Sequence, residues 1–107
     1  MTNKTRSHVV LTLALSLACT AGLAQAPGEA TYKAKCQSCH GVVGMAETTV
    51  GKALKVKPVT DPEVKKFTEA AMIEATKNGM GKMQPFKGKL SDAEIKDSVA
   101  RFRSFMK

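Results

Sequence analysis

The clearest hydrophobic pattern lies at the C-terminal end of the chain. Ile95, Val99, Phe102 and Met106 recur every three or four residues, the spacing that places side chains on one face of a helix. The Ser-Asp-Ala-Glu sequence of residues 91–94 precedes them, in the order of a capping box. The pattern therefore predicts an amphipathic helix from about residue 91 to the C-terminus.

Two shorter helices are predicted in the first part of the chain. Residues 28–37 form one of them, with Ala30, Ala34 and the ring of Tyr32 available to pack. The other begins at the Asp-Pro-Glu sequence of residues 61–63 and continues to about residue 66. An Asp side chain accepts backbone amides at a helix start, and Pro fits the first turn.

A further helix is predicted over residues 69–77. Thr68 can cap it, Ala71, Met72 and Ala75 lie on its candidate buried side, and Asn-Gly at 78–79 ends it. Residues 41–60 and 79–90 contain several glycines and no sustained period, which predicts loops. Because no stretch has the pattern of a strand, the predicted fold class is all-α.

The first 26 residues have the order of a cleavable export signal. Lys4 and Arg6 form a basic start, residues 9–18 are mostly apolar, and Ala-Gln-Ala at 24–26 matches a cleavage site. Two weaker alternatives are an uncleaved N-terminal anchor and a lipoprotein signal that ends at Cys19. The apolar run is too short for a confident membrane span, and no later segment is apolar enough for one. We expect a soluble periplasmic protein with no membrane span in its mature chain.

Removal of residues 1–26 would leave one small domain of 81 residues, 27–107. That length excludes a TIM barrel or a full dinucleotide-binding fold. With one Tyr, four Phe and no Trp, the domain has few large side chains for its core, so we expect something else to fill it. Its 15 basic and 9 acidic residues give a charge of +6, but nucleic-acid binding is not expected without a recognisable motif.

Cysteine and histidine are confined to one short segment of the remaining chain. Cys36, Cys39 and His40 form the C-x-x-C-H pattern of covalent c-type haem attachment. Two thiols at this spacing can form thioethers with the vinyl groups of one porphyrin edge, and the following His can bind iron through Nε2. The sequence therefore predicts one haem c per chain, held by Cys36 and Cys39, with His40 as the proximal iron ligand.

Three other interpretations of this motif are weaker. A thiol-disulfide oxidoreductase would use Cys36 and Cys39, but such motifs usually lie beside a βαβ pattern, which is missing from the sequence. A structural zinc site needs about four ligands, whereas this segment offers three. A disulfide between the two cysteines would close a very small loop and stabilise little.

Methionine is the obvious candidate for the distal iron ligand, because no second histidine remains. Met72 and Met106 have helical spacings that indicate core packing. Met45 follows His40 too closely to reach the opposite face of the ring. Met80 and Met83 both lie in the glycine-rich loop before the last helix and stay open as candidates.

The sequence resembles small bacterial class I cytochromes c, in which a helix leads into C-x-x-C-H and a methionine loop precedes the C-terminal helix. Residues 79–86, Gly-Met-Gly-Lys-Met-Gln-Pro-Phe, resemble that loop, in which the ligand precedes a proline and an aromatic residue. The resemblance implies Met83 as the distal ligand, with Met80 as second choice. It also implies three to five short helices around one covalently bound haem.

Two further features bear on this resemblance. Gly28 and Tyr32 resemble the small-and-aromatic pair with which the family's first helix crosses its last, here near Phe102. The sequence departs from the family after the haem motif, where many members have a proline whose carbonyl orients the ligand histidine. Residues 48–51 contain no proline, so the acceptor for the Nδ1 proton of His40 is not identified.

The resemblance implies a monomeric single-electron carrier and not an enzyme. The alternatives are the thiol-disulfide oxidoreductase and a haem sensor or peroxidase-like domain with an open sixth position. Expected partners are transient redox proteins. Lys82, Lys87 and Lys89 would steer an acidic partner if they surround the exposed haem edge, although a dispersed solvating surface is slightly favoured.

Overall fold

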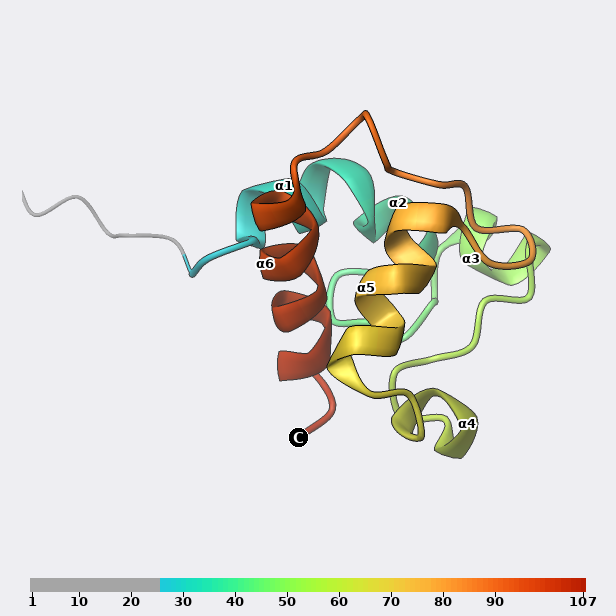
Figure 1. Ribbon diagram of the computed structural model, residues 1–107. Helices are drawn as coiled ribbons and strands as arrows, with labels where there is room; N and C mark the ends of the chain where they lie inside the picture. Colours follow the sequence, from blue (N-terminus) through green and yellow to red (C-terminus); the bar gives the residue numbers. More distant parts are fainter. Residues whose placement is uncertain (1–25) are drawn as a thin grey trace, which may run out of the picture.

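The protein is described by a computed structural model over residues 26–107, so residues 1–25 of the predicted signal lie outside the described part. Six helices form in this part, and α6 lies beside both α1 and α5 (Figure 1). They are α1 (Glu29–Lys35), α2 (Gln37–His40), α3 (Thr49–Ala53), α4 (Pro62–Lys65), α5 (Glu69–Asn78) and α6 (Asp92–Ser104).

The all-α prediction is confirmed. Between residues 26 and 107, extended pairing is limited to two isolated bridges, Met80 with Met83 and Lys87 with Leu90. Six helices exceed the expected three to five, because the first predicted helix is divided in two and a short helix forms in a predicted loop. No helix in this range is long and apolar enough to cross a membrane.

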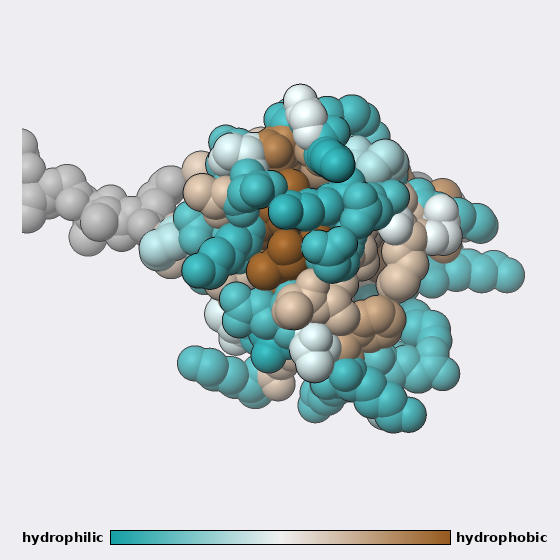
Figure 2. Space-filling model, in the orientation of Figure 1, coloured by the Kyte–Doolittle hydropathy of each residue, from teal (hydrophilic) through white to brown (hydrophobic). Residues whose placement is uncertain are grey.

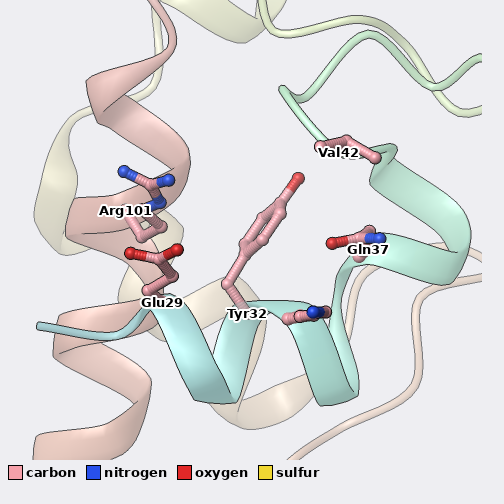
Figure 3. Close-up of a pocket in the computed structure, with 6 residues that line it drawn as sticks. Glu29, Tyr32, Gln37, Val42 and Arg101 are labelled. Atoms are coloured by element: carbon pink, nitrogen blue, oxygen red, sulfur yellow. The ribbon is translucent and has the colours of Figure 1, made fainter. Parts of the chain in front are cut away.

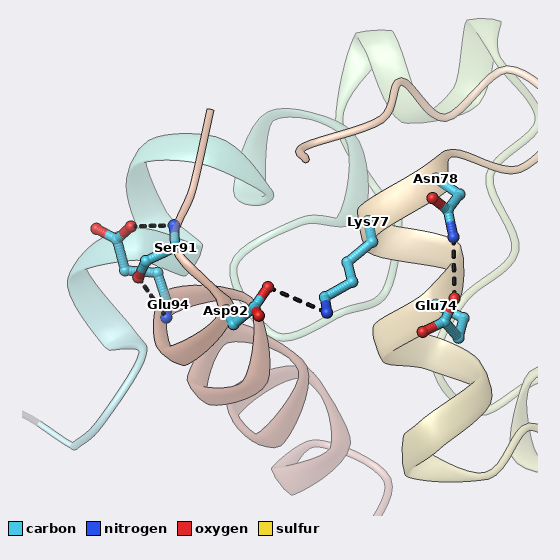
Figure 4. A network of polar contacts seen from close by, with 6 residues as sticks. All are labelled: Glu74, Lys77, Asn78, Ser91, Asp92 and Glu94. Atoms are coloured by element: carbon cyan, nitrogen blue, oxygen red, sulfur yellow. Dashed lines mark hydrogen bonds and ion pairs between the residues drawn. The ribbon is translucent and has the colours of Figure 1, made fainter. Parts of the chain in front are cut away.

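The predicted helix starts are confirmed by their capping bonds. The Ser91 hydroxyl accepts from the Glu94 amide at 3.1 Å, and the Ser91 amide donates to the Glu94 carboxylate at 2.8 Å (Figure 4). The Asp61 carboxylate accepts from the Glu63 amide at 2.8 Å, and the Thr68 hydroxyl caps α5. These side chains bind amides that have no partner within the helix, which is why the sequence fixes the starting points so closely.

Two predictions about the first half of the chain were wrong. The predicted helix over residues 28–37 is divided at Cys36 into α1 and α2. The predicted loop over residues 41–60 contains α3, whose cap is the Thr48 hydroxyl, accepting from the Gly51 amide at 2.9 Å. With only five residues, α3 is too short to show a hydrophobic period, so its cap was the one available signature.

The crossing of α1 over α6 depends on Gly28. This residue has φ +80°, and a Cβ there would overlap the Asp97 carbonyl and lie 2.8 Å from the Ser98 amide nitrogen. Tyr32, one turn further on, packs edge-to-face on Phe105 with 5.5 Å between ring centroids. Both residues meet α6 as predicted, but the ring partner of Tyr32 is Phe105 and not Phe102.

The inward side of α1 also differs from the prediction. Tyr32 is its buried residue, whereas Ala30 and Ala34 are exposed. Because α1 has only seven residues, a single side chain, Tyr32, is the one that it buries. Sequence spacing alone did not show which side of this short helix α6 would cover.

The second packing contact joins α5 to α6. Met72 and Thr76 are buried on α5, and Ile95 and Val99 are buried on α6, with Ile95 fully enclosed. Lys77 forms an ion pair with Asp92 at 3.0 Å between the end of α5 and the start of α6 (Figure 4). Asp92 is exposed while Lys77 is partly buried, and an ion pair open to solvent on one side contributes little beside the apolar contacts.

The apolar core of the described residues is small. It consists of seven side chains: Tyr32, Ala46, Val59, Met72, Phe86, Ile95 and Val99. Hydrophilic residues cover much of the face shown in Figure 2, with apolar residues visible in its middle over α6. This agrees with the expectation from composition that the chain by itself has little with which to fill a core.

Candidate functional site

The C-x-x-C-H segment occupies α2 and the residue before it. Cys36 is the C-cap of α1, and its amide donates to the Tyr32 carbonyl at 2.9 Å. The His40 amide donates to the Cys36 carbonyl, also at 2.9 Å. Cys36 and Cys39 are therefore three residues apart on one turn, where side chains are neighbours. Both are free and half-buried.

The environment of Cys36 is unsuited to thiol catalysis. Burial, followed by the nearby Cys39, raises the pKa of the Cys36 thiol to about 11. At neutral pH it therefore stays protonated, whereas a thiol-disulfide oxidoreductase needs a thiol whose pKa is lowered. The raised pKa of Cys36 thus favours haem attachment over the thiol-disulfide interpretation.

His40 is the last residue of α2, and burial lowers the pKa of its imidazole, which favours the neutral form that binds metals. Its Nδ1 atom is buried and has no hydrogen-bond partner within residues 26–107. The ring packs edge-to-face on Phe102 of α6, with 5.1 Å between centroids and 65° between planes. The sequence did not identify a carbonyl that accepts the Nδ1 proton of His40, and the contacts within residues 26–107 do not identify one either.

Tyr32 ties α1 to the residue that follows His40. Its buried hydroxyl donates to the Gly41 carbonyl at 2.7 Å, and burial is the main reason that its pKa is raised. From the sequence, Tyr32 was expected only to pack. A bond from a side chain to a backbone carbonyl nine residues away has no sequence signature, so this role was missed.

The loop after the motif is fastened to α2 at several points. The Ala46 amide donates to the His40 carbonyl at 2.9 Å, and the Thr48 hydroxyl donates to the Ser38 carbonyl at 2.6 Å. Gly51 of α3 lies so close to α2 that a Cβ there would overlap the Cys39 carbonyl. These contacts hold α2 and α3 together without a proline in the loop.

Met80 and Met83 form a small hairpin after α5. Each amide donates to the other residue's carbonyl, at 3.1 Å and 3.0 Å, and Gly81 between them has φ +58°. Residues paired directly opposite one another project to the same face, so both thioethers leave the hairpin on one side. Met80 is 53 % exposed, whereas Met83 is half-buried.

The hairpin is attached to the end of α5. The Phe86 amide donates to the Thr76 carbonyl at 2.9 Å, and the Lys87 amide donates to the Lys77 carbonyl at 3.1 Å. A Cβ at Gly79, where φ is +79°, would lie 2.8 Å from the Met83 carbonyl. The loop therefore has a defined path, although no hydrogen bond among the described residues links it to α2.

The other methionines lie away from these two segments. Met72 is buried between α5 and α6, with its sulfur 4.0 Å from an Arg103 nitrogen, and Met106 is half-buried near the C-terminus. Met45 is exposed in the loop after the motif. Met72 has the packing role predicted for it, whereas Met106 lies beyond the end of α6 and is outside the buried core.

A partly open pocket of about 290 Å³ lies beside the motif but does not contain it. In Figure 3, Tyr32 stands between Glu29 and Arg101 on one side and Gln37 and Val42 on the other. None of Cys36, Cys39, His40 and Met83 lines this pocket, which belongs to the outer surface of the α1–α6 crossing. We therefore do not place the cofactor there.

The donor set of α2 fits a covalently held haem. It offers two free thiols on one turn, followed by a half-buried imidazole whose pKa is lowered. Large apolar side chains are exposed in the two segments that flank the proposed site: Val42, Val43, Met45 and Val50 after the motif, and Met80 in the hairpin.

Comparisons with known proteins agree with this chemistry. The family described as "Cytochrome C oxidase, cbb3-type, subunit III" matches residues 23–100. Among solved structures, the KustC0563 c-type cytochrome has 35 % identity and a TM-score of 0.67, covering 75 % of this chain and 98 % of that one. A tyrosine-to-phenylalanine mutant of Kustc0563 has 33 % identity and a TM-score of 0.65, with 74 % and 98 % covered. No curated protein sequence matches.

Proposed function

The chain belongs to the c-type cytochromes, within the cbb3-type cytochrome c oxidase subunit III family, and we propose that it is an exported carrier of single electrons between proteins. The observation that carries the proposal is the single turn holding Cys36, Cys39 and the half-buried His40. Haem c, when bound, supplies one-electron exchange between Fe(III) and Fe(II). The contribution of the chain is to hold, orient and shield it.

Each proposed ligand has a separate role. Cys36 and Cys39 would hold the group through thioethers, and His40 would offer Nε2 to its iron as the proximal ligand. Met83 is the proposed distal ligand, because its half-buried thioether lies in the loop that precedes Pro85 and Phe86. A neutral, soft sulfur favours Fe(II), so Met83 would raise the reduction potential.

Met80 is the second choice, because the hairpin directs it to the same face as Met83. A site with both axial positions filled has no place for a substrate, which is the reason for proposing a carrier and not an enzyme. If neither methionine binds, the sixth position is open, and a haem sensor or peroxidase-like function takes precedence.

We further propose that the partners are transient and carry acidic surfaces. Lys82, Lys87 and Lys89 are exposed in and directly after the methionine hairpin, and no acidic side chain within residues 26–107 forms a salt bridge with them. By contrast, Lys57 and Lys77 are engaged by Glu63 and Asp92. Unpaired charge beside the site favours brief, salt-sensitive encounters. Export depends on the predicted signal, and the mature chain is proposed to be monomeric and periplasmic.

The first experiment is expression of the full precursor in a host with haem-maturation machinery, followed by mass and absorption measurements on the purified protein. We expect one covalent haem, loss of residues 1–26, and a low-spin spectrum with the weak oxidised-state band of sulfur-iron bonding. The double variant Cys36→Ala/Cys39→Ala should contain no covalent haem. Normal haem content in that variant would refute the attachment.

The distal ligand is tested by the matched variants Met83→Ala and Met80→Ala. We expect Met83→Ala to lose the sulfur-iron band and to bind carbon monoxide readily in the reduced state, while Met80→Ala keeps the wild-type spectrum. The reverse pattern would assign the ligand to Met80. A band that survives in both variants would exclude both assignments.

A further inference from the structure

The peptide unit between Gly41 and Val42, just after His40, is held at both ends. Its carbonyl accepts from the Tyr32 hydroxyl at 2.7 Å, and its amide donates to the Glu47 carboxylate at 3.2 Å. Figure 3 shows the Tyr32 hydroxyl pointing toward the segment that carries Val42. Hydrogen bonds in a row polarise one another, and a carboxylate acceptor makes its bond stronger than a neutral one would. The two side chains therefore act on this peptide unit in the same direction.

The position of the Glu47 carboxylate is supported by two further observations. Gly41 has φ +82°, and a Cβ there would overlap the carboxylate. After burial and Cys36, the charge of Glu47 is the next cause of the raised pKa of Tyr32. The carboxylate thus lies against the backbone that follows His40, although Glu47 as a residue is exposed.

The backbone that carries Glu47 is fixed on both sides of it. The Ala46 amide donates to the His40 carbonyl at 2.9 Å, and the Thr48 hydroxyl donates to the Ser38 carbonyl at 2.6 Å. Ala46 is buried with φ +53°, a conformation that costs free energy for a residue with a Cβ and persists only where the surroundings impose it. Neighbours that bind the turn of the motif therefore direct the Glu47 side chain back toward it.

We propose that Glu47 is a positioning residue of the haem site: with Tyr32 it clamps the Gly41–Val42 peptide, and it places a negative charge beside the turn that ends at His40. The inference rests on the proposed function in taking His40 as an iron ligand. A nearby negative charge stabilises Fe(III) relative to Fe(II), because reduction adds an electron to the site. Glu47 therefore lowers the reduction potential, in the opposite direction to a methionine ligand.

The clamp is tested by amide hydrogen exchange in the reduced holoprotein, followed by NMR. Glu47→Ala removes the acceptor of the Val42 amide, whereas Glu47→Gln keeps an oxygen acceptor without its charge. We expect Val42 to exchange about tenfold faster in Glu47→Ala than in the wild type, with Glu47→Gln between them. Glu69→Gln is the control and should leave the rate unchanged, because Glu69 is exposed on α5 and, like Glu47, forms no ion pair within residues 26–107. An unchanged Val42 rate in Glu47→Ala would overturn the proposal.

The charge is tested by the reduction potential of the same holoproteins at pH 7 and low ionic strength, where charges are screened least. Glu47→Gln and Glu69→Gln each remove one negative charge, but α5 makes no close contact with α2 in the described part of the chain. We expect the potential to rise in Glu47→Gln and to rise clearly less in Glu69→Gln. Equal shifts would overturn the proposal. The comparison stands even if Glu47→Ala fails to mature.

A double-mutant cycle tests whether Glu47 and Tyr32 act on one peptide unit. We expect Glu47→Ala to lower the free energy of unfolding less in a Tyr32→Phe background than in the wild type, because the two bonds support each other. The effects of Tyr32→Phe and Glu69→Gln should add. Additive effects of Glu47→Ala and Tyr32→Phe would overturn the clamp. Failure of the proposed function is distinguishable, since it would appear as missing covalent haem or a missing sulfur-iron band.

Discussion

Replacing Tyr32 by Phe removes one hydroxyl from the centre of the molecule and leaves the packing of the ring intact. That hydroxyl donates to the carbonyl of Gly41 at 2.7 Å, and both residues are buried. A typical internal hydrogen bond contributes about 1 kcal/mol net, and a buried acceptor left without its partner costs about 1–3 kcal/mol. The Gly41 carbonyl keeps one long contact, from the Gly44 amide at 3.4 Å. We therefore expect a loss of about 1–2 kcal/mol.

The measurement is thermal and guanidinium unfolding of the holoprotein at pH 7, followed by circular dichroism. For a domain of this size, each 1 kcal/mol lowers the midpoint by about 4–8 °C. Ser104→Ala is a matched control, because its hydroxyl also donates to a carbonyl, that of Arg101 at 2.6 Å, but is exposed. We expect the control to change stability by less than about 0.5 kcal/mol. A Tyr32→Phe protein no less stable than Ser104→Ala would refute the reasoning.

The same residue gives the effect a characteristic pH dependence. Burial raises the pKa of the Tyr32 hydroxyl above its ordinary value of 10.0, so above that pH the unfolded chain releases its proton while the folded chain retains it. The stabilisation is therefore complete below about pH 10 and is lost progressively as the pH rises. The wild type should lose stability more steeply than Tyr32→Phe above pH 10, so that the difference between them narrows. A difference that is constant from pH 8 to 11 would contradict this.

Three further predictions concern the helix crossing, the cap and the methionine hairpin. Gly28→Ala should lower the free energy of unfolding by about 1–3 kcal/mol, because the new Cβ would overlap α6. Gly88→Ala is the control, since Gly88 also has positive φ but has open space around it, and it should cost less. Equal losses of stability in urea unfolding would contradict the overlap. Hydrogen bonds with Ser91 lower the pKa of the Glu94 carboxyl, so the ionised carboxylate stabilises the folded protein near neutral pH. The wild type should therefore be more stable than Glu94→Gln near pH 7, and this difference should disappear as the pH falls through the pKa of the carboxyl. Unfolding measurements on both proteins at decreasing pH test this. Gly79→Ala, whose Cβ would press on the Met83 carbonyl, should weaken the sulfur-iron band without loss of covalent haem; an unchanged band would show that the hairpin tolerates the shift.

The parts of the fold that the sequence predicted are those determined by neighbouring residues. Asp61, Thr68 and Ser91 each bind an amide two or three residues ahead, so the starts of α4, α5 and α6 could be read directly. The attachment motif was equally readable, because its chemistry requires a fixed spacing along one chain. The burial expected at Ala30 failed for the opposite reason, since the side of α1 that packs inward depends on where α6 crosses it.

The contacts around His40 show the same division at the site itself. Its place at the end of α2 follows from the motif, but the residue that packs on it is 62 positions away in the chain. The hydroxyl that holds the Gly41 carbonyl comes from α1, and its acceptor is backbone, which leaves no trace in the order of side chains. The motif could therefore be found from the sequence, whereas the contacts that its last residue and the next one make with α6 and α1 required the fold.

The two aromatic side chains near the end of α6 explain why a helix far from the motif in the chain bears directly on it. Phe102 packs on the imidazole of His40, while Phe105 packs on Tyr32, whose hydroxyl holds the backbone of the next residue, Gly41. One helix thus acts on two consecutive residues, through the side chain of the first and the main chain of the second. A displacement of α6 would move both contacts together, because the residues they hold are joined by one peptide bond. In a domain with only seven buried apolar side chains, one of them, Tyr32, therefore takes part both in the packing of α1 on the end of α6 and in holding the backbone that follows His40.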